Sequence, residues 1–340
     1  MPQASIDSVI KRVQTRVEER ADPYLRFAQD VHEGLSHQPR TLPSEYLYDE
    51  RGSILFDEIC RQPEYYLTRT EAAILEQFGS EIANLCGDCT VVELGAGTSV
   101  KSPLILRPLL TTQDRARYIA LDVSESALRQ GQQHIKSELP DVESYMLCGQ
   151  YMDGFTLRSY LERVLYVLLG STLGNFDQQE LTDFFRGAAA RCQPGDHFLL
   201  GVDLHKERGV LEDAYNDQAG VTAAFTCNLF ERLGREVAPS FDPSVVRHVA
   251  FYAEAQRRIE IYGEFQETTR IELPLVGHSH VVEAGERVRT EISRKFELEV
   301  LGPQLAQLGF ATKRVFVDKN QYFGLLLLVR SDDAGTARLI

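Results

Sequence analysis

The chain has 340 residues, 43% of them hydrophobic, and 36 basic against 50 acidic residues give it a formal net charge of −14. This composition supports a buried core of one large or two smaller domains, and its acidity disfavours nucleic acid or an anionic membrane as a partner. Six cysteines are too few for a disulfide scaffold, and neither a transmembrane run nor an apolar signal core is found, so we expect a cytoplasmic protein.

The first part of the chain is predicted to be mostly helical. Helical periodicity covers residues 5–36 and returns over 69–78. Residues 42–55 lie between them and contain a proline and a glycine, which indicates a turn-rich loop.

Strands alternate with helices in the middle of the chain. Four short apolar runs are predicted as strands that are buried on both faces: 90–94, 118–122, 164–169 and 197–202. Helical spacers separate them. This alternation is typical of an α/β fold with a parallel, doubly wound sheet.

The alternation stops near residue 203. Residues 211–233 are predicted as a helix, and strand-like alternation follows at 258–262. Residues 296–330 are predicted as a helix and a hairpin, which could add an antiparallel edge strand to the first sheet. The second domain would then be an insertion in the first.

A glycine turn follows the first predicted strand. Gly95 and Gly97 would let a ligand approach the backbone closely, although they could also serve only a tight turn. Val100 stands where the dinucleotide fingerprint has a third glycine, which disfavours a pyrophosphate ligand. Asp122 ends the next strand, where it could accept hydrogen bonds from a ribose or act as a helix cap. Together these features favour an S-adenosylmethionine methyltransferase over a nicotinamide enzyme.

Other polar residues have both a binding and a structural interpretation. Lys101 could contact the methionyl carboxylate or be solvated, and Asn175 could face the ligand crevice or stabilise a turn. Glu291 and Ser293 alternate along a predicted strand and so face one side, where they could bind a polar group or meet solvent. The one C-x-x-C sequence has no second ligand pair, so we expect no metal.

Several longer motifs occur in a fixed order over residues 40–330. They are YDERGSILF at 48–56, PEYYLTRTE at 63–71, ELGAGTSVK at 93–101, LGSTLGNF at 169–176, GVDLHK at 201–206, AYND at 214–217 and RTEISRKF at 289–296. Together they resemble the histidine-specific N-methyltransferase family. Its best-known member makes hercynine, the trimethylated betaine of histidine, in ergothioneine biosynthesis.

The resemblance implies an architecture of two domains. Residues 70–205 and 296–340 would form a Rossmann-like class I methyltransferase domain that binds S-adenosyl-L-methionine. Residues 1–69 and 206–295 would form a discontinuous second α+β domain that binds the substrate. The resemblance further suggests a monomer that acts on a small molecule and needs no metal.

The resemblance also implies the residues of both binding sites. Those for S-adenosyl-L-methionine would be Gly95, Lys101, Asp122, Gln150 and Tyr151. Those for L-histidine would be Asn175 and Tyr215 at the α-carboxylate, Tyr48 near the α-amine, and Tyr65, Ile261, Glu291 and Ser293 around the imidazole. Tyr48 is also the candidate catalytic residue, since it or a solvent water would receive the proton of the α-ammonium group.

Three positions depart from the family pattern. Gln150 stands where an aspartate usually contacts the adenine amine, Ile261 replaces a methionine beside the imidazole, and Phe316 replaces the tryptophan of a Trp-x-Asp pattern. Glu291 with Ser293 favours histidine, since a carboxylate left buried without the ring N–H costs about 1–3 kcal/mol. The predicted reaction is Nα-trimethylation of L-histidine to hercynine, the first step of ergothioneine biosynthesis.

Three alternatives remain open. The enzyme could methylate another amino acid, such as tryptophan or tyrosine. It could be a nicotinamide-dependent dehydrogenase of similar fold, or a binding subunit that has the fold without turnover. Mass spectrometry of an amino-acid panel and a binding assay with both cofactors would separate them.

Overall fold

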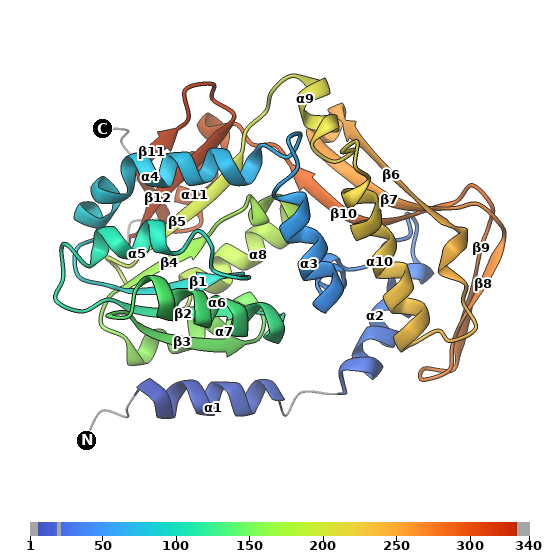
Figure 1. Ribbon diagram of the computed structural model, residues 1–340, viewed down its shortest axis with the longest axis horizontal. Helices are drawn as coiled ribbons and strands as arrows, with labels where there is room; N and C mark the ends of the chain where they lie inside the picture. Colours follow the sequence, from blue (N-terminus) through green and yellow to red (C-terminus); the bar gives the residue numbers. More distant parts are fainter. Residues whose placement is uncertain (1–5, 19–21, 332–340) are drawn as a thin grey trace. The chain divides into compact units, whose positions relative to one another are not determined.

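The computed structural model describes residues 6–18 and 22–331, and the chain divides into two compact units (Figure 1). The first unit comprises Met1–Glu19, Leu67–His205 and Lys295–Ile340. The second unit comprises Arg20–Tyr66 and Lys206–Arg294. Each unit is therefore discontinuous in sequence.

Within the described residues, the first unit contains a seven-stranded sheet in the order β11-β12-β5-β4-β1-β2-β3. Its strands are β1 (Thr90–Leu94), β2 (Arg117–Asp122), β3 (Glu143–Cys148), β4 (Val164–Leu168), β5 (His197–Asp203), β11 (Phe310–Val317) and β12 (Phe323–Arg330). Strands β3, β2, β1, β4 and β5 are parallel, whereas β12 is antiparallel to both β5 and β11. The antiparallel strand thus lies inside the sheet, not at its edge as predicted.

Helices of the first unit bury apolar faces in the core of this sheet. They are α1 (Ile6–Glu18), α4 (Leu67–Cys86), α5 (Pro103–Leu109), α6 (Glu125–Glu138), α7 (Tyr151–Thr156), α8 (Gln178–Ala189) and α11 (Leu298–Gln307). In α8, the Asp177 side chain caps the first turn by accepting the N–H groups of residues 179 and 180. Leu181, Phe184, Phe185 and Ala188 are buried at intervals of three or four residues, and the remaining side chains of the helix are mostly solvated, as expected for an amphipathic helix. The predicted Rossmann-like α/β fold is confirmed.

Helix α1 belongs to the first unit, although the sequence placed all of residues 1–69 in the second domain. Val9, Ile10 and Val13 are buried in the same apolar cluster as the side chains of the first unit's sheet. Burial of this apolar face, rather than position in the sequence, determines where the helix packs.

The second unit combines helices with small antiparallel sheets. Its elements are α2 (Pro23–Ser36), α3 (Glu50–Ile59), α9 (Arg208–Asp213), α10 (Val221–Glu236), β6 (Val246–Ala253), β7 (Arg258–Phe265), β8 (Thr269–Leu273), β9 (His278–Val282) and β10 (Arg287–Arg294). The described strands form a three-stranded sheet, β10-β7-β6, and a β8-β9 hairpin. Helix α10 packs on this sheet so closely that a Cβ at Gly263 would lie 2.3 Å from the Phe230 ring.

Two predicted elements of the second unit differ from the structure. The expected loop at 42–55 contains the start of α3, because Asp49 caps that helix. The expected helix at 211–233 is broken into α9 and α10, with Gly220 at φ +73° before the second helix. Among the described residues, no helix has the length and apolar character needed to cross a membrane.

Candidate functional site

The turn after β1 is built from residues with left-handed backbone angles. Gly95 has φ +75° and Gly97 has φ +53°, conformations that strain residues with a Cβ. The N–H groups of Gly95 and Ala96 donate to the carbonyl oxygen of Leu121 at 2.8 and 3.0 Å. The turn therefore lies at the carboxyl ends of β1 and β2, where doubly wound folds bind their ligands.

Asp122 ends β2 and holds this turn through its carboxylate. One oxygen accepts the N–H of Gly97 at 2.8 Å, and the other accepts the N–H of Ser124 at 2.9 Å. Burial raises the pKa of Asp122, and these hydrogen bonds oppose that shift. Each carboxylate oxygen can accept a second hydrogen bond, so ordering the loop leaves Asp122 with acceptor capacity for a ribose hydroxyl. Ser124, not Asp122, caps the following helix.

Gln150 and Tyr151 follow β3 and lie at the same carboxyl ends of the strands. A Cβ at Gly95 would be 3.4 Å from Cε1 of Tyr151, so this ring lies against the glycine turn. Gln150 comes before α7 and donates its N–H to Asp153 at 2.8 Å, while the N–H of Gly149 donates to the carbonyl of Asp122 at 2.9 Å. The loops that carry these predicted cofactor residues therefore meet at the ends of β1, β2 and β3.

Lys101 forms an ion pair with Glu71 of α4. The Glu71 side chain is fully buried, and both of its oxygens accept the N–H of Gly170 at 2.9 Å. Glu71 is not predicted as a site residue from the sequence. A signal was available, because it precedes the buried Ile74 and Leu75 by three and four residues and therefore shares their helix face.

A second buried carboxylate, Glu93, lies on β1 near this pair. It accepts hydrogen bonds from Ser102 Oγ at 2.5 Å and from Tyr118 OH at 2.7 Å. Burial raises the pKa of Glu93, whereas the two hydroxyl donors and the charge of Lys101 lower it. Through these two hydrogen bonds, Glu93 connects Ser102, in the loop after β1, to Tyr118 of β2.

Asn175 is the one predicted substrate residue in the first unit. It ends a short 3-10 helix, Thr172–Asn175, which follows β4. Residues 169–175 also include Gly170, where a Cβ would be 3.7 Å from Nζ of Lys101. The loop of Asn175 is therefore adjacent to a predicted cofactor residue.

The predicted imidazole residues come together in the second unit. Tyr215 donates its hydroxyl to Ser293 Oγ at 2.7 Å, and its ring meets that of Tyr65 edge-on at 6.1 Å between centroids. Ile261 of β7 pairs with Glu291 of β10 across the sheet. Burial and the nearby charges of Tyr215, Cys60, Tyr48 and Glu291 raise the pKa of Tyr65 well above its usual value, so its hydroxyl stays protonated. Tyr215, expected at the α-carboxylate, is in contact with the expected imidazole residues.

Tyr48 contributes an aromatic ring to the same unit. Its centroid lies 5.6 Å from Phe56 and 5.4 Å from Phe225, both in edge-on geometry. The π faces of such rings carry partial negative charge and attract organic cations.

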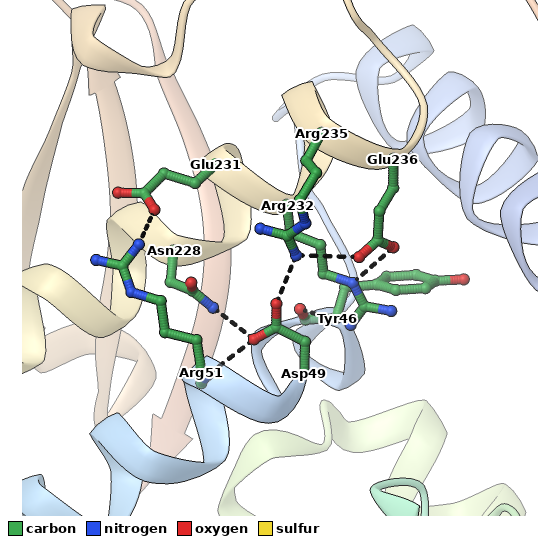
Figure 2. Close-up of polar contacts among 9 residues, drawn as sticks. Tyr46, Asp49, Arg51, Asn228, Glu231, Arg232, Arg235 and Glu236 are labelled. Carbon is green, nitrogen blue, oxygen red and sulfur yellow. Dashed lines mark hydrogen bonds and ion pairs between the residues drawn. The ribbon is translucent and has the colours of Figure 1, made fainter.

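Asp49, the residue after Tyr48, is the centre of a polar cluster between α3 and α10 (Figure 2). Its oxygens accept the N–H of Gly52 at 2.8 Å, Nδ2 of Asn228 at 2.8 Å and a guanidinium N–H of Arg235 at 2.7 Å. Burial alone would raise the pKa of Asp49, but these donors outweigh it and hold the pKa below 3.8. The cluster fixes the backbone that carries Tyr48.

The described residues include no group of three histidine, cysteine, aspartate or glutamate side chains arranged to hold a metal ion. The groups that the fold places at the carboxyl ends of β1 and β2 are backbone N–H groups, a lysine, carboxylates and an aromatic ring. A glycine turn, an acidic strand end and an antiparallel strand between β5 and β11 define the class of protein: a Rossmann-like S-adenosylmethionine-dependent methyltransferase.

Comparison with known proteins identifies the family. The model of the histidine-specific, SAM-dependent methyltransferases matches residues 27–330. The chain is 38% identical over 302 residues to histidine N-alpha-methyltransferase of Mycolicibacterium smegmatis, covering 89% of this chain and 94% of that protein. It is 37% identical over 307 residues to histidine N-alpha-methyltransferase of Mycobacterium tuberculosis, covering 90% and 96%.

A third relative is ergothioneine biosynthesis protein 1 of Neurospora crassa, 29% identical over 302 residues, covering 86% of this chain and 33% of that protein. The chain belongs to the histidine-specific, S-adenosylmethionine-dependent methyltransferase family. The family resemblance seen in the sequence is confirmed, and with it S-adenosyl-L-methionine as the co-substrate. Membership disfavours the nicotinamide alternative.

Proposed function

We propose that this enzyme transfers three methyl groups from S-adenosyl-L-methionine to the α-amine of L-histidine and forms hercynine, the first step of ergothioneine biosynthesis. The observation that carries the proposal is the cluster of Tyr65, Tyr215, Glu291 and Ser293 in the second unit. The Glu291 carboxylate and the Ser293 hydroxyl, on one face of β10, can satisfy the N–H and the ring nitrogen of an imidazole. The histidine N-alpha-methyltransferases at 37–38% identity support the same substrate.

We assign the two ligands to different residues of the chain. S-adenosyl-L-methionine is bound by Gly95, Lys101, Asp122, Gln150 and Tyr151 of the first unit. The imidazole is bound by Tyr65, Glu291 and Ser293, with Ile261 as an apolar wall. Asn175 and Tyr215 bind the α-carboxylate, and Tyr48 lies at the α-amine. A monomeric, cytoplasmic enzyme without a metal is part of the same proposal.

Methyl transfer is an in-line displacement at the methyl carbon of the sulfonium. The amine lone pair forms the new C–N bond while the C–S bond breaks and its electron pair stays on sulfur. The α-ammonium first loses a proton, to Tyr48 or to a solvent water. No covalent enzyme intermediate is needed, so positioning supplies most of the rate acceleration, about 7–11 kcal/mol at best.

For three successive transfers, the binding site must accommodate an ammonium group that gains one methyl group at each step. The rings of Tyr48, Phe56 and Phe225 lie together in the second unit, with centroids 5.4–6.0 Å apart. Contact with such rings stabilises a methylated ammonium by about 0.5–2 kcal/mol. The quaternary product has no lone pair, which ends the cycle after the third methyl group.

The test is mass spectrometry of an amino-acid panel incubated with the enzyme and S-adenosyl-L-methionine. The panel holds L-histidine, L-tryptophan, L-tyrosine and the two ring-N-methylated histidines. We expect a gain of three methyl groups on histidine, and a much lower rate for at least one ring-methylated isomer, since methylation removes a donor to Glu291. Preferential methylation of tryptophan or tyrosine would refute the substrate and leave the reaction class standing.

A further inference from the structure

We infer that Glu71 is a positioning residue for S-adenosyl-L-methionine: it holds the ammonium of Lys101 and the backbone of Gly170 in their binding geometry. The inference rests on the proposed function only through the role of Lys101 as a ligand of the methionyl carboxylate. Glu71 itself is fully buried, so the role inferred for it acts through Lys101 and Gly170.

Glu71 connects loops that follow two different strands. Its carboxylate pairs with Lys101, in the loop after β1, and accepts the N–H of Gly170, in the loop after β4. It also lies against β5, since a Cβ at Gly201 would be 1.8 Å from its Oε1. One side chain of α4 thus ties together the ends of β1, β4 and β5, at the edge where this fold binds its ligands.

The packing leaves the carboxylate little freedom. The Glu71 side chain has no exposed surface, and the space beside β5 exists only because residue 201 is a glycine. A buried carboxylate is costly unless it is paired and hydrogen-bonded, so Glu71 requires Lys101 close by. The position of Lys101 is therefore imposed by the fold before any ligand arrives.

Lys101 can serve Glu71 and a ligand together. A lysine ammonium has three N–H donors, and the Glu71 pair uses one. The Lys101 side chain is 19% exposed, so it is accessible to a carboxylate from solvent. A lysine held in one rotamer loses less conformational freedom on binding than a mobile one. Without Glu71, this preorganisation is lost.

The test compares Glu71→Gln with Glu76→Gln, the same change at an exposed position of the same helix. The glutamine oxygen can still accept the Gly170 N–H, so the variant isolates the contact with Lys101. We expect the Kd for S-adenosyl-L-methionine, measured by calorimetry, and its KM to rise roughly tenfold in Glu71→Gln. The KM for histidine should change less than about twofold, and Glu76→Gln should match the wild type.

A double-mutant cycle shows whether Glu71 acts through Lys101. The Kd of Glu71→Gln/Lys101→Met should equal that of Lys101→Met alone, and additive losses would overturn the inference. An unchanged Kd in Glu71→Gln, with or without a lower Tm, would also overturn it. If Glu71→Gln does not fold, the double variant, which removes both charges, is compared with Lys101→Met. If the wild type binds the cofactor but leaves histidine unmethylated, the proposed function fails while this inference stands.

Discussion

Glu291 is the acidic member of the proposed imidazole site and lies on β10 opposite Ile261 of β7. The pairing register shifts between Arg289 and Glu291, which marks a β-bulge. Bulges re-aim side chains and are common beside active sites. The irregular strand therefore presents Glu291 and Ser293 on one face after the bulge.

Glu291→Ala should weaken histidine recognition specifically. Removing the acceptor of a ring N–H is expected to raise the KM for histidine about 10- to 100-fold, because a hydrogen bond to a charged group contributes about 1.5–3 kcal/mol. The KM for S-adenosyl-L-methionine should stay within about twofold. Steady-state kinetics with each substrate varied in turn measures both, with the exposed Glu272→Ala of the same unit as control. Equal KM changes for both substrates would contradict the assignment.

At the residue scale, the sequence could indicate which side chains share a strand face, but not which distant side chains are in contact with each other. The alternation of Glu291 and Ser293 is visible locally, since period two is a property of any strand. The contact between Tyr65 and Tyr215, and the pair of Glu71 with Lys101, join segments far apart in the chain. No local sequence pattern encodes such pairs, so only the three-dimensional structure reveals them.

The helix α3 depends on how its first turn is built. Asp49 caps it through the N–H of Gly52, and a Cβ at Gly52 would lie 1.8 Å from the carbonyl oxygen of Leu47. The glycine inside the helix is thus a packing requirement. The same turn carries Tyr48 immediately before the cap.

Asp49→Ala should destabilise the protein by about 1–2 kcal/mol, the usual effect of losing an N-cap. It should also raise the KM for histidine, because the chain beside Tyr48 loses its contact with Asn228 of α10. Urea unfolding and steady-state kinetics measure the two effects. Arg235→Ala is the control, since it removes only the ion pairs of a half-exposed arginine with Asp49 and Glu236 and should cost under about 1 kcal/mol. Equal losses in both variants would contradict the capping role.

At the element scale, burial decided which strands could be predicted. Strands β1, β4 and β5 are buried at every position, and their continuous apolar runs matched the structure to within one residue. Strand β3 was missed because it lies at the edge of the sheet, starts with an exposed glutamate and has only one fully buried residue. The start of α3 was missed because Gly52 suggested a loop.

The stability of the whole molecule should depend on His197 at the start of β5. Burial and the charges of Lys313 and Arg163 lower its pKa to about 4 from 6.5, and its buried Nδ1 has no hydrogen-bond partner in the described structure. Between these pH values the unfolded chain binds a proton that the folded chain does not. The free energy of unfolding should therefore decrease as pH falls from 6.5 to about 4, and this contribution should be constant above that range.

His197→Gln removes this titration and keeps a group that can contact Lys313. Urea unfolding at several pH values should show that the wild type loses more stability than the variant between pH 6.5 and about 4. Parallel curves for the two proteins would show that His197 titrates alike in the folded and unfolded states.

At the scale of the molecule, the sequence predicted a doubly wound sheet interrupted by an insertion. The alternation of strands and helices stops near residue 203, and the helix and hairpin pattern of residues 296–330 fits the first sheet again, which is why an insertion was predicted. The placement of α1 could not be predicted, because its apolar face fits either unit and only three-dimensional packing chooses between them.

Because the chain returns to the first sheet after the second unit, the two units can be completed only in a fixed order during translation. Strand β5 pairs with β12, which leaves the ribosome only after all of Lys206–Arg294. Until then β5 has an unpaired edge, a feature that promotes association between nascent chains. The second unit has all its residues earlier, so it can fold before the first sheet is complete. The last described strand in the chain is thus an interior strand of the sheet, and translation must reach β12 before the sheet of the first unit can be completed.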